Sequence, residues 1–332
     1  MTRKISHSLI NGRTGAGTAG QGLKVEWDST NDGELHWMDV DESSLEYVAP
    51  VFQGSNYGFT AGGSVSDTID KYAFSSNTTA TDHGDLAISI NEQAGCSSSD
   101  SGFTAGGYTG STTDVINKFS FTSNTTASDH GDLSVVKYIS SGQSSSTQGF
   151  ASGGNTGSAT TAIDKFAFSS NTTASDHGDL SAARQRSAGQ SGTDYGFTSG
   201  GGGSSNVIDR FAFSSNTTAS DWGDLAETVS SDQAGCSSST HGFDSGGEQG
   251  GGYSNRINKF SFTSNVTASD HGDLAISRGF RAGTSETDYG FTAGGWYPLI
   301  NNVDKFAYSS NTTATDHGDL SVSRSSASGS QY

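Results

Sequence analysis

The sequence predicts an all-β protein built from six similar units, and three observations support this prediction. A twelve-residue segment, SSNTTASDHGDL at 169–180, recurs in close copies at 75–86, 122–133, 214–225, 263–274 and 309–320. Glycine doublets recur with it, at intervals of 44 to 48 residues. Between these markers lie short segments of alternating apolar residues, and no stretch has the 3.6-residue period of a helix. We therefore predict four short strands in each unit, and the length of the unit matches one blade of a β-propeller.

The innermost strand of each blade is expected to be a segment of the type AGxSS, because only small side chains fit near the centre of a closed ring. Five copies begin at 94, 141, 188, 234 and 282, and a sixth, SGSQY at 328–332, ends the chain. We therefore expect residues 326–332 to supply the inner strand of the blade that begins at Tyr57, which closes the ring. The alternative is that residues 48–55 supply this strand.

The second strand contains Gly-Phe before the glycine doublet, and the third has the form IDKFAF. In the copy at 163–168, Phe166 and Phe168 share one face while Ile163 and Ala167 line the other. Apolar residues on both faces are typical of a sheet that is packed on both sides, and ring closure buries those faces and removes long exposed edges. The SSNTTA segment predicts a turn. Its Asn-Thr-Thr also fits a glycosylation acceptor, which we interpret as a turn unless the protein is made in a eukaryotic cell.

The DHGD segment that follows the turn contains Asp and His, which can bind metals. One copy, however, reads DWGD with Trp222 in the His position. A position that accepts both His and Trp predicts packing between blades or at the rim, and the Asp and Gly suit a bend before the strand that contains Asp-Leu. We expect neither a metal site nor a cofactor.

The order of inner strand, glycine doublet after the second strand, aromatic third strand, turn and fourth strand resembles the kelch repeat. Kelch units usually carry Trp in the fourth strand, where this chain has Ala80, Ala127 and Ala174. The resemblance implies a divergent, six-bladed kelch-like β-propeller over residues 57–332. Residues 1–56 precede the repeats, have strand-like pieces around a polar turn at 22–42, and are too few for more than a marginal core. We interpret them as an attachment or assembly arm.

The composition argues against several classes of function. The net charge is −18 with no Lys/Arg-dense face, which disfavours a nucleic-acid partner. No apolar run is long enough to span a membrane, and the first residues lack the apolar region of a secretory signal. Cys96 and Cys236 occupy equivalent positions in the second and fifth units, on opposite sides of a ring of six. We therefore expect two small buried thiols and no disulfide.

Sequence variation among the units concentrates on one rim of the predicted ring. The loops after the second and fourth strands differ freely, while the turns after the first and third strands are nearly identical. Loops on a rigid scaffold commonly carry binding residues, and aromatic and Arg side chains commonly dominate contacts. Unconstrained drift of these loops is the alternative. On the binding hypothesis, we expect contacts from Tyr108, Tyr138, Arg184, Arg186, Tyr253, Phe280, Arg281, Trp296 and Tyr297.

The repeat consensus IDKFxFSSxxxATDxGDL, with its Gly/Ser-rich array and short N-terminal arm, is similar to structural proteins of bacteriophage virions. The resemblance implies a multicopy or homo-oligomeric virion protein, such as a tail fibre, appendage or decoration protein. Residues 1–56 would contact other virion proteins, and the variable rim would contact a host surface receptor or glycan.

Two alternatives remain open. One is a purely architectural propeller without a ligand, on a virion or a cell surface. The other is a sialidase-like glycan-active enzyme. The SDxG segment partly matches the Asp box of sialidases, but Ala stands where Ser or Thr is expected, and the inner strands carry no cluster of Arg and Tyr. We therefore expect no catalytic residues.

Overall fold

The structure, a computed structural model, describes residues 21–24, 36–39 and 54–331 of the 332-residue chain. The chain divides into two compact units, Met1–Val48 and Ala49–Tyr332. In the first unit, β1 (Gln21–Lys24) pairs antiparallel with β2 (His36–Asp39). The rest of the predicted arm up to residue 53 lies outside the described residues. The described residues contain no helix long and apolar enough to cross a membrane.

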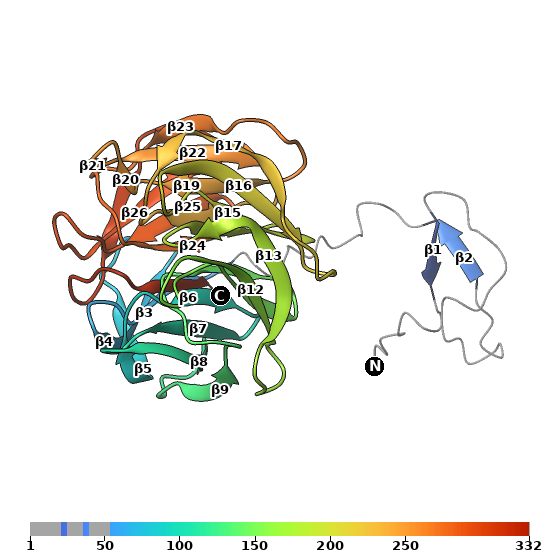
Figure 1. Cartoon of the computed structure of the whole chain (residues 1–332), viewed down its shortest axis with the longest axis horizontal. Helices are drawn as coiled ribbons and strands as arrows, with labels where there is room; N and C mark the ends of the chain where they lie inside the picture. The colour runs from blue at the N-terminus through green and yellow to red at the C-terminus, as the bar shows by residue number, and fades with distance from the viewer. Residues whose placement is uncertain (1–20, 25–35, 40–53, 332) are drawn as a thin grey trace. The chain divides into compact units, whose positions relative to one another are not determined.

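The second unit is a six-bladed β-propeller of four-stranded antiparallel blades, as the sequence predicts. Figure 1 shows the six sheets grouped around a common centre. The inner strands of blades one to six are β28 (Ser328–Gln331), β6 (Ala94–Ser97), β10 (Ser141–Ser144), β14 (Ala188–Ser191), β18 (Ala234–Ser237) and β24 (Ala282–Ser285). The second strands are β3 (Tyr57–Ala61), β7 (Ser101–Tyr108), β11 (Gln148–Ser152), β15 (Tyr195–Ser199), β19 (His241–Ser245) and β25 (Tyr289–Ala293).

The third and fourth strands complete each blade. The third strands are β4 (Ser66–Ala73), β8 (Thr112–Ser120), β12 (Thr160–Ala167), β16 (Ser205–Ala212), β22 (Arg256–Ser261) and β26 (Asn302–Ala307). The fourth strands are β5 (Thr81–Ile90), β9 (Ser128–Asp132), β13 (Ser175–Arg184), β17 (Ser220–Val229), β23 (Ser269–Asp273) and β27 (Thr315–Asp319). Blade five alone inserts a small hairpin among the described residues, β20 (Glu248–Gln249) with β21 (Gly252–Tyr253), between its second and third strands.

The C-terminal strand closes the ring. β28 pairs antiparallel with β3, with Ser328 opposite Ala61 and Gln331 opposite Gly58, and it lies between the inner strands β6 and β24 of the neighbouring blades (Figure 1). This confirms closure by the C-terminus and excludes residues 48–55 as the first inner strand. The backbone N–H of Gly54 donates to the carbonyl of Ser285 at 2.8 Å, next to the turn between the first two strands of blade six. The chain therefore enters the propeller on the rim of the near-identical turns.

The hydrophobic core lies between the blades. In the pair formed by blades three and four, Phe150, Ile163 and Leu180 pack against Phe211 and Phe213 of the next blade. The rings of Phe150 and Phe213 stack with centroids 4.8 Å apart, and the closing pair, Phe291 and Phe74, repeats this geometry at 4.6 Å. Because each aromatic third strand buries its rings against the neighbouring blade, one blade alone would leave half of this surface in water.

The recurring twelve-residue segment also joins the blades. His177 bonds through Nε2 to the carbonyl of Ala212 in the next blade at 2.8 Å, and Trp222 donates its Nε1–H to the carbonyl of Ser261 at the same distance. Both rings thus present one N–H at the same place, which explains why the position accepts either residue. The packing prediction is confirmed. The Asp and Gly form a local irregularity directly before Asp179 and Leu180, within β13: its register with β12 breaks there, Gly178 has φ of 94°, and the Gly178 N–H donates to Oδ1 of Asp176.

Candidate functional site

The inner strands pack closely around the propeller axis because their residues there are small. A Cβ added to Gly142 would lie 2.0 Å from the carbonyl oxygen of Gly95 in the preceding blade, and equivalent contacts occur at Gly95, Gly189, Gly235, Gly283 and Gly329. Two residues further along, the backbone N–H of Ser144 donates to the hydroxyl of Ser191 at 2.9 Å. The inner strands approach so closely that only glycine fits at the first level. This confirms the prediction that small residues line the centre.

Above the glycines, one residue from each blade forms a closed ring, which we call the crown. Its members are Glu92, Ile139, Arg186, Asp232, Phe280 and Ser326. The N–H of each member donates to the carbonyl oxygen of the member before it, and the six N···O distances lie between 2.7 and 3.1 Å. The crown sits in the connections between one blade's fourth strand and the next blade's inner strand, on the rim whose loops vary.

Every crown residue has a left-handed backbone, with φ between 51° and 69°. This conformation costs a residue with a side chain about 1–3 kcal/mol, and for β-branched Ile139 it is an outlier. Glycine adopts it without that cost, and the chain uses glycine freely, with 46 in total. None of the six crown positions is glycine, and all six side chains differ. The crown therefore keeps an identical backbone frame and a different chemical group at each position.

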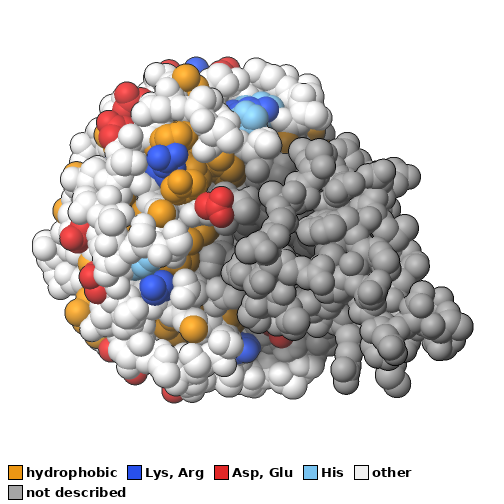
Figure 2. All heavy atoms as spheres, turned by 90° about the vertical axis from the view of Figure 1, so that its right-hand side faces the viewer, with side chains coloured by type: hydrophobic (Ala, Val, Ile, Leu, Met, Phe, Trp, Pro, Cys, Tyr) orange, Lys and Arg blue, Asp and Glu red, His pale blue; other side chains and the backbone are white. Residues whose placement is uncertain are grey.

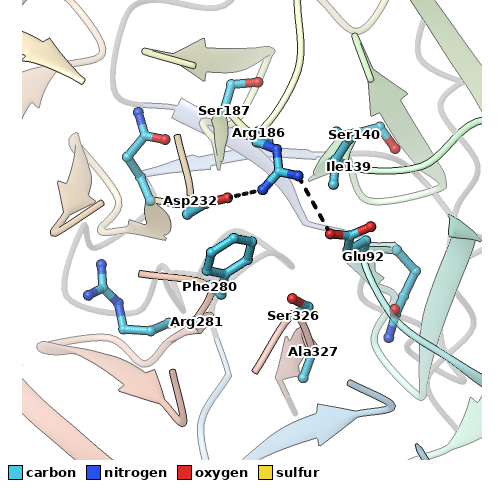
Figure 3. A pocket seen from close by; sticks show the side chains of 12 residues that line it. Glu92, Ile139, Ser140, Arg186, Ser187, Asp232, Phe280, Arg281, Ser326 and Ala327 are labelled. Carbon is cyan, nitrogen blue, oxygen red and sulfur yellow. Dashed lines mark hydrogen bonds and ion pairs between the residues drawn. The ribbon is translucent and has the colours of Figure 1, made fainter. Parts of the chain in front are cut away.

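The crown side chains line an axial hollow of about 90 Å³ that opens to solvent. Figure 3 shows Arg186 between the two acidic residues, with Phe280 beside it. Arg186 pairs with Asp232 at 3.0 Å and with Glu92 at 3.8 Å, and its guanidinium carbon lies 5.2 Å from the centre of the Phe280 ring. Burial raises the pKa of both carboxyls, and the charge of Arg186 opposes that shift.

Arg281 lies at the floor of the hollow and is almost wholly buried. It donates to the carbonyl oxygens of Arg278 and Ser245. Burial, and then the charge of Arg278, lower its pKa to about 9. Three of the nine predicted contact residues, Arg186, Phe280 and Arg281, therefore line this hollow, although the guanidinium of Arg281 is buried and bonded to backbone carbonyls.

Three more predicted residues form an exposed group that we call the aromatic ledge: Tyr253, Trp296 and Tyr297. The rings of Tyr253 and Tyr297 stack with centroids 5.6 Å apart, and Trp296 meets Tyr297 edge to face at 5.7 Å. The fractional exposure of Trp296 is 42% and that of Tyr297 is 66%. The ledge thus brings together residues from the loops of blades five and six.

The remaining three predicted residues lie elsewhere. Tyr108 and Tyr138 contact each other at 5.9 Å between centroids, on blades two and three. Arg184 is only 2% exposed and pairs with Asp209 of the next blade at 3.1 Å. Because its guanidinium is enclosed between blades, Arg184 has no surface to offer a ligand.

Sequence reasoning did not single out Glu92 and Asp232, which face Arg186 across the hollow. Neither residue is aromatic or cationic, and neither belongs to a recurring motif. The available signal was positional: the residue two before each inner strand is the one that differs in all six units.

The His, Cys, Asp and Glu of residues 54–331 form no cluster of three or more that could hold a metal ion. Cys96 and Cys236 are free and buried, as predicted, and burial raises the pKa of each thiol to about 12. In Figure 2 the charged side chains of the visible face are scattered, and hydrophobic side chains lie between them near its middle.

No protein-family model matches this chain, and a search of curated proteins finds no relative of it. Its functional interpretation therefore rests on the repeat pattern and on the geometry of the axial hollow.

Proposed function

We propose that this protein is a multicopy component of a bacteriophage virion, as a fibre, appendage or decoration protein, and that its propeller binds a host surface glycan without catalysing a reaction. The resemblance of the repeat consensus to virion proteins supports the location, with residues 1–56 as the attachment arm. The crown supports the binding role.

The observation that carries the binding role is the retention of six different side chains at six strained backbone positions. If the crown served only to close the ring, glycine would make the same N–H to carbonyl bonds at lower cost. Strain of this kind concentrates at sites where the side chain has a task. The crown is also concave and central, which is where a ligand can touch several blades at once.

The chemistry of the hollow suits a sugar. Asp232, Glu92 and Arg186 offer planar donors and acceptors that can bond neighbouring hydroxyl groups in pairs, and Phe280 offers an apolar ring face. The two acids share one guanidinium. This arrangement presents fixed hydrogen-bonding groups to a ligand, which suits recognition.

The binding role is tested on an array of bacterial surface glycans with the full chain and matched variants. Arg186→Asn and Asp232→Asn remove a charge while keeping a residue that tolerates the left-handed backbone. Each variant should lose at least tenfold in affinity for the glycan that the wild type binds. Tyr195→Ala, at an exposed position on the opposite rim, is the control and should bind normally.

The virion location is tested by mass spectrometry of purified particles and by deletion of residues 1–56. The intact chain should be found in particles, and the deleted chain should be lost from them. Incorporation without glycan binding by any form would favour the purely architectural alternative. Turnover of a glycan by the wild type would favour the enzyme.

A further inference from the structure

The aromatic ledge adjoins the axial hollow, and Gly279 marks the junction. A Cβ on Gly279 would lie 2.5 Å from Cε1 of Tyr253 and 3.2 Å from Cβ of Asp232. Gly279 also exchanges backbone hydrogen bonds with Trp296, at 2.9 and 3.4 Å. One glycine therefore touches both a ledge ring and a crown residue, and the next residue in the chain is Phe280 of the crown.

The local structure holds the ledge rings outward. Tyr253 ends the β20–β21 hairpin, which is inserted between the second and third strands of blade five. Tyr297 has a left-handed backbone, with φ of 64°, and yet carries the most exposed large apolar side chain among the described residues. As in the crown, a strained position holds a bulky side chain that glycine could replace more cheaply.

The charges in the hollow are balanced, whereas the protein as a whole is strongly acidic. The charged residues that line the hollow are two acids, Glu92 and Asp232, and two cations, Arg186 and Arg281, so their formal sum is zero. The whole chain carries −18. Its field therefore repels polyanions over long range, and the hollow has no net charge that would attract an acidic sugar.

We infer that the hollow and the ledge form one elongated site for an uncharged glycan chain, with one sugar in the axial hollow and the next sugars packed against the exposed rings of Trp296 and Tyr297, the latter supported from behind by Tyr253. This inference rests on the proposed glycan-binding function and specifies its ligand. The crown supplies hydrogen bonds for the first sugar. The ledge supplies flat ring faces, which stack on the apolar face of a sugar and tolerate differences in its hydroxyl groups.

The test measures how affinity depends on chain length and charge. Neutral oligosaccharides of one to six sugars, and acidic counterparts that carry uronic or sialic acid, are screened on an array, and the best neutral series is then titrated by calorimetry. We expect the wild type to bind a trisaccharide at least tenfold more tightly than its monosaccharide and to prefer neutral chains.

Two variants each remove one ledge ring at a residue outside the crown. Tyr297→Ala deletes the most exposed ring, and Trp296→Ala deletes the ring that meets it edge to face. Both should reduce the advantage of the trisaccharide to less than about threefold while leaving monosaccharide affinity unchanged. Tyr108→Ala, an exposed aromatic residue on the same rim outside the ledge, should retain the full advantage.

The outcomes separate this inference from the proposed function. If Asp232→Asn abolishes binding but the two ledge variants keep the dependence on length, the elongated site is wrong and the glycan-binding function stands. A preference for acidic chains would overturn the uncharged ligand. Absence of binding to every oligosaccharide would overturn both proposals.

Discussion

Arg324 and Asp70 are 254 positions apart in the sequence, and they form a buried ion pair with a distance of 2.7 Å between Nη2 and Oδ2. Arg324 follows the fourth strand of blade six, and Asp70 lies in the third strand of blade one. The guanidinium also donates to the carbonyl oxygen of Thr68 at 2.9 Å. This pair therefore fastens the last blade to the first, in addition to the strand pairing of β28.

The two positions held by Arg324 and Asp70 recur at every blade junction, and each junction carries either an ion pair or a neutral pair there. Three further junctions carry buried ion pairs, Lys137–Asp164, Arg184–Asp209 and Arg278–Asp304. At the other two junctions the cation is replaced by Ile90 or Val229, and the equivalent acid is replaced by Asn117 or Asn258. Cation and acid change together, so none of these junctions leaves a buried charge unpaired.

The first prediction concerns exchange of the two junction types. Asp164→Asn leaves the buried ammonium of Lys137 without its counter-ion and should lower the free energy of unfolding by about 3–5 kcal/mol. The double variant Lys137→Ile with Asp164→Asn recreates the neutral junction of Ile90 and Asn117 and should recover most of that loss. Chemical denaturation measures both. A double variant as unstable as the single one would show that the two types are not interchangeable.

The second prediction concerns closure by the C-terminal strand. Deletion of residues 328–332 removes the partner of β3 and opens the ring, so the free energy of unfolding should fall by at least about 4 kcal/mol. A synthetic peptide of residues 326–332 should restore part of the stability by adding the missing strand. The same peptide with Gly329→Val should fail, because a Cβ there would lie 2.1 Å from the carbonyl oxygen of Gly283. Equal rescue by both peptides would contradict the close approach.

The third prediction concerns the glycines at the axis. Gly142→Ala forces a methyl group against the Gly95 carbonyl and should destabilise the propeller by about 1–3 kcal/mol or more, because neighbouring inner strands must move apart. Gly252→Ala is the matched control: nothing lies within 4 Å of its added Cβ, and its backbone is not left-handed. Thermal unfolding of the two variants should differ clearly. Similar melting temperatures would argue against a tightly closed centre.

The fourth prediction concerns pH. Burial lowers the pKa of His177 below its ordinary value, and its Nδ1 is buried without a hydrogen-bond partner. Since the unfolded chain takes up the proton first, stability is complete above about pH 6.5 and falls as the pH drops toward the lowered pKa, by at most about 1.4 kcal/mol per pH unit for each such group.

His177→Trp should keep the bond to the Ala212 carbonyl, as Trp222 keeps its own, while removing one titrating group. Denaturation between pH 7.5 and 5 should therefore show a shallower loss of stability in this variant than in the wild type. His177→Ala loses the bond as well and should be less stable at every pH, by about 1–3 kcal/mol. An unchanged slope in the Trp variant would show that His177 does not titrate on unfolding.

The sequence by itself determined the architecture. The period, the small residues of the inner strands and the partial sixth copy at 328–332 predict six blades closed by the C-terminus, because a repeated unit can bury its faces only against copies of itself. The exchange of His for Trp222 likewise predicted packing between blades. What repeats in this chain is the set of contacts that every blade makes with the next.

Tertiary structure alone decided the site. Glu92 and Asp232 come from separate blades, and ring closure places them beside Arg186, which no local pattern encodes. Arg184 and Arg186 are two positions apart, yet the former is enclosed at a blade junction while the left-handed backbone of the latter turns its side chain toward the axis. Repetition fixes where each backbone segment runs, but the meeting of unlike side chains at the axis depends on distances that exist only once the ring has closed.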